Sequence, residues 1–158
     1  MQRIAACAAL AALLAAGAAH AQVSVKDAWV RATVPQQKAT GAFMRIESAQ
    51  DRKLVSARSP LTPTVEVHEM SMRDNVMRMR EVPAIDVPAG KPLELRPGGY
   101  HIMLRDLTQQ VKEGEVVPLT LVFEGPGGQR ENVEVRATVK GLQHAAPAAH
   151  GGHGGHKP

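Results

Sequence analysis

The stretch GGYHIMLRDL, residues 98–107, alternates apolar and polar side chains after a pair of glycines, which is typical of a β-strand that follows a turn. Successive side chains of a strand point to opposite faces, so Ile102 and Leu104 share one face. His101 and Met103 then share the other face, where a sandwich strand normally presents Thr, Lys or Glu to water. The stretch therefore predicts a strand with an imidazole and a thioether side by side on its outer face.

The sequence on both sides of this stretch consists of short apolar-alternating or β-branched segments, which proline, glycine and other turn residues separate. Hairpin turns are expected near residues 73–75 and at GPGG, residues 125–128. No window of about a dozen residues shows helical periodicity, so the pattern predicts an all-β domain, a sandwich. The expected strands are 23–34, 41–48, 53–59, 64–72, 75–83, 92–99, 100–107, 116–125 and 131–142.

The N-terminal sequence, residues 1–22, has one early cation, an Ala/Leu-rich apolar run and the sequence AHA before Gln22. This pattern is typical of a secretory signal peptide, and we expect cleavage after Ala21 and a periplasmic product. The apolar run is too short and too rich in alanine for a retained membrane span. The sequence IAAC around Cys7 resembles a lipoprotein box, but it precedes the apolar run, so we do not assign lipid attachment to it.

The C-terminal sequence QHAAPAAHGGHGGHKP, residues 143–158, has no core-forming residue beyond alanine and is expected to be a disordered tail. The expected organisation is therefore a signal peptide at 1–21, one β-sandwich domain at 22–142 and a His/Gly-rich tail at 143–158.

Composition narrows the possible functions. Cys7 is the only cysteine, so the processed chain has no thiol, disulfide or CxxC motif. Any metal must then be bound by histidine, methionine, carboxylate or backbone groups. The net charge of +4 comes without a Lys/Arg run, and aromatic residues are few, which argues against nucleic-acid binding.

Histidine and methionine are concentrated in two parts of the expected sheet. Strand geometry places His68, Met70 and Met72 on one face, and it also places Met77 and Met79 together. Thioether sulfur is a soft, neutral ligand that selects Cu(I), with Ag(I) as a mimic, whereas imidazole serves several metals. Taken singly, a strand methionine is usually core filler, and a lone strand histidine is usually a hydrogen-bonded surface residue.

The spacing of these residues resembles a known family. His68, Met79, His101 and Met103 match the pattern His-x10-Met-x21-His-x-Met, which resembles the signature of the periplasmic PCu(A)C copper chaperones. The sequences DAWVRAT, TGAFMRI, VEVHEM and GGYHIML also look like landmarks of that family.

The resemblance implies a cupredoxin-like Greek-key β-sandwich that binds one Cu(I) through His68, Met79, His101 and Met103. It also implies delivery of copper to the binuclear copper centre of respiratory cytochrome oxidase, or to another periplasmic copper carrier, by a protein we expect to be a monomer. The remaining methionines of 70–77 have no role in the family, and we interpret them as a soft rim whose members pack rather than coordinate.

Two other groups of residues need an interpretation. We interpret Trp29 as a core anchor and Arg31 as an ion-pair partner or surface charge, and we place neither in the site. The Gly-Gly-His units of the tail favour Cu(II), because glycine lets imidazole and amide nitrogens approach one metal. The alternative is a solubilising tail that binds no metal. The tail histidines are His144, His150, His153 and His156.

Alternative functions remain to be weighed against a chaperone. A copper buffer or resistance protein without a dedicated recipient would use the same ligands. An enzyme is not expected, because a blue-copper centre needs cysteine and a copper oxygenase with an N-terminal histidine would need His in place of Gln22. The sequence also lacks a nucleophile–base–acid set.

Overall fold

The computed structural model describes residues 23–144, which form ten β-strands and no helix within that range. Consequently, the described part of the chain offers no helix that is long and apolar enough to cross a membrane. The strands are β1 (Val23–Arg31), β2 (Thr40–Ser48), β3 (Arg52–Arg58), β4 (Thr64–Arg73), β5 (Val76–Glu81), β6 (Ile85–Val87), β7 (Leu93–Leu95), β8 (Tyr100–Arg105), β9 (Val116–Glu124) and β10 (Arg130–Lys140).

Each of the nine expected segments overlaps one of these strands, with ends that differ by a few residues, and the all-β prediction is confirmed. The strand that the sequence did not predict is β6, which has three residues and lies between Pro83 and Pro88. A three-residue strand is too short to show alternation, and its pairing with β3 rather than its own sequence defines it.

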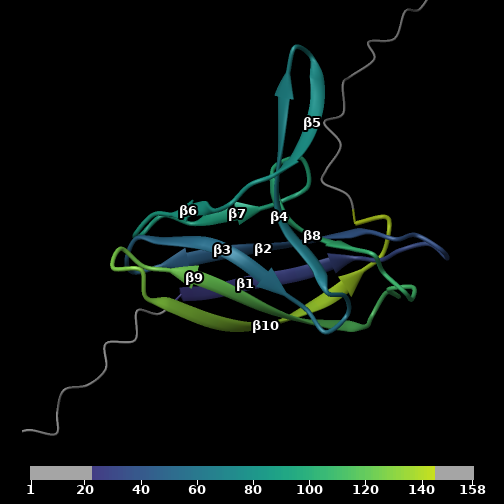
Figure 1. The fold of residues 1–158 in the computed structure, drawn as a ribbon. Helices are drawn as coiled ribbons and strands as arrows, with labels where there is room; N and C mark the ends of the chain where they lie inside the picture. The colour runs from purple at the N-terminus through teal and green to yellow at the C-terminus, as the bar shows by residue number, and fades with distance from the viewer. Residues whose placement is uncertain (1–22, 145–158) are drawn as a thin grey trace, which may run out of the picture.

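The strands form one continuous sheet in the order β5-β4-β8-β2-β1-β10-β9-β3-β6, with β7 paired to β2 (Figure 1). All named pairs are antiparallel except β1 with β10. Strand β3 packs against β4, although the two lie near opposite ends of this order, so the sheet curls over itself. The outcome is the β-sandwich that the sequence predicts.

The apolar face of every long strand contributes to one core between the two halves of the sheet. Each large apolar side chain that is fully buried there stabilises the fold by about 1.5–3 kcal/mol, so these residues hold the two halves together. The largest fully buried side chains include Phe123, Ile46, Leu54, Ile102, Leu104, Leu107, Leu119 and Leu121.

A β-bulge in β1 corrects our interpretation of Trp29. The register of β1 against β2 shifts between Lys26 and Trp29, and Asp27 adopts a left-handed φ of 52°. Without the bulge, Trp29 would share the inward face of Val23. The bulge moves Val30 inward and turns Trp29 to the outer face, so Trp29 is not a core anchor.

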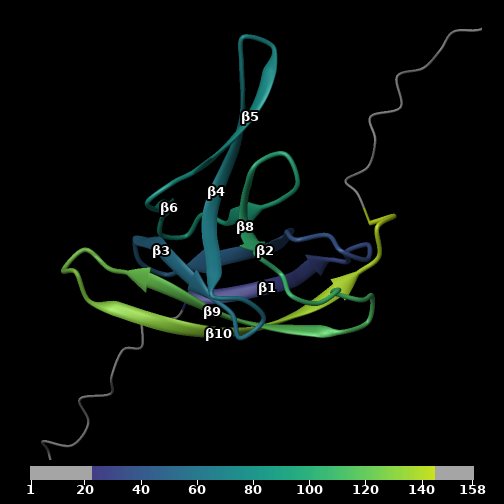
Figure 2. The ribbon, with the colours of Figure 1, turned by 45° about the vertical axis from the view of Figure 1, so that its right-hand side comes forward.

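The hairpin formed by β4 and β5 stands away from the rest of the sandwich (Figures 1 and 2). Its two-residue turn has left-handed φ angles at Asp74 and Asn75, 51° and 60°, as a type I′ turn requires, which confirms the turn expected at 73–75. Every residue of β5 is exposed, because β5 is an edge strand whose only neighbour is β4. The base of the hairpin lies beside β8, the strand that carries His101 and Met103.

Candidate metal-binding site

Strands β4, β5 and β8 bring the four predicted ligands to one face of the sheet. His68 on β4 lies directly opposite His101 on β8, and their ring centroids are 5.7 Å apart. Nε2 of His101 lies 3.2 Å from Sδ of Met79, which comes from β5. Met103 is on the same face as His101, two positions along β8, opposite Glu66 of β4. The structure thus brings three ligands into close proximity and aligns the fourth beside them.

The two histidines face away from the core but are not exposed. Ile102 and Leu104 point inward, as the alternation predicts, whereas His101 is only 4% exposed and His68 only 7%. Met79 is 47% exposed and lies above His101. Because both rings are buried, truncation of either histidine would leave a cavity and should lower the stability of the fold.

The hydrogen bonds of His101 define which ring nitrogen is free. Nδ1 lies 3.0 Å from the carbonyl oxygen of Gly99, which only accepts hydrogen bonds, so the Nδ1–H donates to it. Burial lowers the pKa of His101 from its ordinary value of 6.5, and the nearby His68 adds to this, although the bond to Gly99 acts in the opposite direction. The ring is therefore neutral, and its unprotonated Nε2 faces the sulfur of Met79.

His68 is held in the opposite way. Its Nε2–H donates to Oε2 of Glu66 at 2.7 Å, because a carboxylate is purely an acceptor. Its Nδ1 is buried and has no hydrogen-bond partner among the described residues. The bond to His68 lowers the pKa of Glu66 below 4.5, and Arg105 contributes in the same direction. The carboxylate thus stays charged and orients the ring.

An aromatic pair forms one wall of the site. Phe43 of β2 is 5% exposed, with its ring centroid 6.2 Å from that of His101 and 4.5 Å from that of Trp29. Gly41 lies opposite Met103, and a Cβ there would be 2.8 Å from the Phe43 ring. The Phe43 ring can lie across Gly41 because this residue has no Cβ. The sequences DAWVRAT and TGAFMRI contain Trp29 and Phe43, but neither sequence indicates that the two rings meet beside the site.

Arg31 belongs to the same wall. Its guanidinium carbon lies 5.7 Å from the centroid of the Phe43 ring, a cation–π arrangement, and its Nε is buried without a hydrogen-bond partner among the described residues. Of the two expected roles, ion-pair partner or surface charge, the first is not found, because Arg31 makes no ion pair within 23–144.

The first tail histidine lies near the aromatic pair. The ring centroid of His144 is 5.1 Å from that of Trp29, and its Nε2 is 3.2 Å from Nζ of Lys140. His150, His153 and His156 lie outside the described residues.

The other hairpin methionines lie outside the core, at the rim of the site where the sequence analysis placed them. Met72 is 65% exposed and Met77 is 48% exposed, and Met70 is half-buried. Met44, in contrast, is a core residue at 3% exposure.

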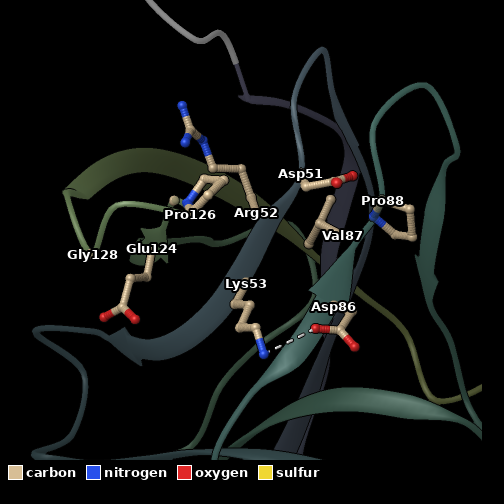
Figure 3. A pocket seen from close by; sticks show the side chains of 10 residues that line it. Asp51, Arg52, Lys53, Asp86, Val87, Pro88, Glu124, Pro126 and Gly128 are labelled. Carbon is tan, nitrogen blue, oxygen red and sulfur yellow. Dashed lines mark ion pairs between the residues drawn. The ribbon is translucent and has the colours of Figure 1, made fainter.

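The hollow in Figure 3 lies elsewhere, at β3, β6 and the β9–β10 turn. Lys53 pairs with Asp86 at 3.5 Å on its rim, and none of its lining residues is histidine or methionine. Within 23–144, no group of three or more His, Cys, Asp or Glu residues is arranged to hold a metal. The candidate site is therefore the cluster of two histidines and two methionines, which can bind a metal only if the thioethers serve as ligands.

Known proteins resemble the chain over this whole domain. Residues 23–139 match the model of a family described as "Putative lipoprotein LpqE-like". A protein of Leifsonia xyli, described as a putative lipoprotein, is 30% identical over 102 residues, which are 64% of this chain and 61% of that protein. The chain thus spans less than two thirds of the length of this relative.

Solved structures resemble the fold as well. The apo form of DR1885 from Deinococcus radiodurans is 34% identical, with a TM-score of 0.57 over 83% of this chain and 87% of that one. Its Cu(I) form is 35% identical, with a TM-score of 0.56 over 79% and 83% of the two chains. The copper-bound PCuAC domain of PmoF2 shares the fold at 21% identity, with a TM-score of 0.59 over 75% and 92%. The chain therefore belongs to the LpqE-like family and has the cupredoxin-like fold of PCuAC domains.

Proposed function

We propose that this protein is a copper chaperone that binds one Cu(I) through His68, Met79, His101 and Met103. The observation that carries the proposal is the convergence of Nε2 of His101 on Sδ of Met79 at 3.2 Å. A nitrogen lone pair and a sulfur lone pair gain nothing from facing each other unless a proton or a metal lies between them. The proton of His101 is on the other nitrogen, so a metal fits this arrangement.

The donor atoms follow from the hydrogen bonds. His101 would bind through Nε2 and His68 through Nδ1, its buried nitrogen without a partner. Glu66 and the Gly99 carbonyl then act as the outer acceptors that fix each ring, an arrangement common around metal-binding histidines. Two neutral imidazoles with two neutral thioethers form a soft donor set, which suits Cu(I) better than Zn²⁺ or Mg²⁺.

The exposure of the donors supports transfer rather than permanent storage. Met79 is 47% exposed on an edge strand, so an acceptor can approach this ligand first. A thioether carries no proton, so no proton has to move when Met79 is replaced by a ligand of the acceptor. The replacement also leaves copper as Cu(I). The histidines, at 4% and 7% exposure, would be exchanged last.

The recipient that the family resemblance suggests is the binuclear copper centre of cytochrome oxidase. A copper buffer or resistance protein without a dedicated recipient is the alternative. Mixing the Cu(I)-loaded protein with the apo copper-binding subunit of the oxidase distinguishes the two. A chaperone should transfer its copper to that subunit, and retention of the copper would favour the buffer.

The processing of the chain is part of the same proposal. We propose export to the periplasm with cleavage after Ala21, leaving a monomeric domain at 22–142 and a tail at 143–158. The lipoprotein descriptions of the family and of the relative support export. Mass spectrometry of the protein purified from the periplasm tests this, because an N-terminus at Gln22 excludes a lipid on Cys7.

The tail is proposed as a second, Cu(II)-selective ligand set. His144, His150, His153 and His156 supply nitrogen ligands only, which suit the divalent ion. The contact of His144 with Trp29, whose neighbour Phe43 lies beside His101, supports a tail that starts on the face of the Cu(I) site.

A further inference from the structure

Three methionines of the β4–β5 hairpin are not used by the proposed Cu(I) site. Met72 and Met77 are 65% and 48% exposed, and Met70 is half-buried. Exposed thioethers contribute nothing to a core, and a soluble hairpin is normally covered by polar side chains on both faces. This hairpin instead presents only methionines on one face from its turn to the pair formed by His68 and Glu81.

The register of the hairpin aligns these side chains in pairs. Met70 lies directly opposite Met79, and Met72 lies directly opposite Met77. The backbone N–H of Met70 donates to the carbonyl of Gly99 on the other side of β4, so Met70 makes no ladder bond to β5 through this group. Arg73 and Val76 close the two-residue turn as a hydrogen-bonded pair, which makes the two methionine pairs non-hydrogen-bonded.

Non-hydrogen-bonded positions bring opposing side chains closest. Directly opposite Cβ atoms are about 4.5–5.5 Å apart, and diagonal neighbours about 7–8 Å, within reach of long side chains. Methionine has three rotatable bonds, so the sulfurs of Met70, Met72 and Met77 can meet over the hairpin. Met79 is turned the other way, because its sulfur lies against His101.

The charges of the hairpin do not oppose a bound cation. Arg78 and Arg80 project from the opposite face, where Arg78 faces Ser71. Arg80 is already paired with Glu69 at 2.6 Å. The methionine face carries no charged side chain between the turn and the pair formed by His68 and Glu81.

We propose that Met70, Met72 and Met77 form a second Cu(I) site, made of thioethers alone, above the first. This inference rests on the proposed function and extends it. The two sites would be adjacent along the β4–β5 hairpin, with Met79 between them. The second site does not need the first to be occupied, so each can be removed without the other. Its ligand is a soft monovalent ion, Cu(I) or its mimic Ag(I).

The test is an anaerobic Cu(I) titration of the full-length protein with ¹³C-labelled methionine methyl groups, followed by NMR. We expect two successive sets of shifts, one of Met79 and Met103 and one of Met70, Met72 and Met77. The methyl group of Met44 is the internal control and should not move, because it is buried in the core. Hairpin methyl signals that stay unchanged with excess Cu(I), or that shift together with Met103 in one step, would overturn the second site.

Two variants separate this proposal from the first site. Met72→Leu with Met77→Leu keeps an apolar side chain at exposed positions, so the fold should persist. The shift of Met70, the remaining reporter of the second site, should then vanish, while those of Met79 and Met103 persist. His101→Gln with Met103→Leu, in which glutamine fills much of the buried space of the ring, should abolish the Met79 shift and leave the hairpin shifts. If the hairpin shifts disappear there too, no separate site exists. If Met79 and Met103 never shift in the unaltered protein while Met72 does, the proposed function fails and this inference stands.

Discussion

Glu66→Gln is the substitution that tests how the site is built, because Glu66 would not touch the metal. Its carboxylate accepts the Nε2–H of His68 at 2.7 Å and is mostly shielded, with 18% of the side chain exposed. We expect this bond to hold the ring so that Nδ1 faces the metal. Glutamine keeps an acceptor oxygen of the same shape but removes the charge.

The size of the effect follows from the two kinds of hydrogen bond. A bond to a charged group contributes about 1.5–3 kcal/mol and a neutral one about 0.5–1.5 kcal/mol, so the substitution should cost about 1–1.5 kcal/mol. That corresponds to roughly tenfold weaker Cu(I) binding. Substitution of the hydrogen-bond partner of a metal ligand typically lowers metal affinity 10- to 100-fold. We expect a loss at the lower end of this range, because glutamine retains an acceptor oxygen.

The assay is competition for Cu(I) against a coloured chelator at pH 7, where Glu66 is ionised because its pKa is lowered. Glu69→Gln is the matched control, since Glu69 lies on the same strand but pairs with Arg80 on the other face. ¹⁵N NMR should show His68 with its proton on Nε2 in the unaltered apoprotein and a mixture of tautomers in the variant. An affinity within about threefold of the unaltered protein, or an equal loss in the control, would refute the reasoning.

Three further predictions concern the surroundings of the site. Gly41→Ala should lower the free energy of unfolding by about 1–3 kcal/mol, measured by urea denaturation, because the new Cβ would lie 2.8 Å from the Phe43 ring; Gly99→Ala, whose Cβ has only ordinary contacts, should not. The lowered pKa of His101 means that the unfolded chain takes up a proton first as the pH falls below about 6.5. The free energy of unfolding of the apoprotein should therefore be highest above pH 6.5 and decrease toward pH 5. If His101→Gln shows the same decrease, His101 is not its cause. Truncation after Leu142 should abolish Cu(II) binding and keep Cu(I) binding, and lowering the pH should release Cu(II) before Cu(I), as paired titrations under oxidising and reducing conditions would show.

Much of the fold is legible in the sequence because each long strand has one buried face. Alternation in residues 98–107 predicts that Ile102 points inward and His101 outward, and the structure agrees. The turn at Asp74 and Asn75 is predictable for a similar reason, since these residues tolerate the left-handed angles of a two-residue hairpin.

The features that the sequence did not reveal depend on contacts between distant strands. Alternation from Val23 would place Trp29 inward, and only the bulge at Asp27 reverses it. The burial of His101 could not be foreseen either, because it comes from Phe43 on β2 and Met79 on β5. The sequence also does not show which ring nitrogen of each histidine is free. That depends on the hydrogen bonds to Glu66 and to the Gly99 carbonyl, whose geometry is set only in the folded sheet.

The central claim is that two histidines and two methionines bind one Cu(I). X-ray absorption at the copper edge tests it most directly on protein that ends at Leu142 and carries Met72→Leu with Met77→Leu, loaded with less than one equivalent of Cu(I). We predict a first shell of nitrogen and sulfur together, with the sulfur contribution halved by Met103→Leu. A shell of nitrogen and oxygen alone, or one that Met103→Leu leaves unchanged, would contradict the assignment.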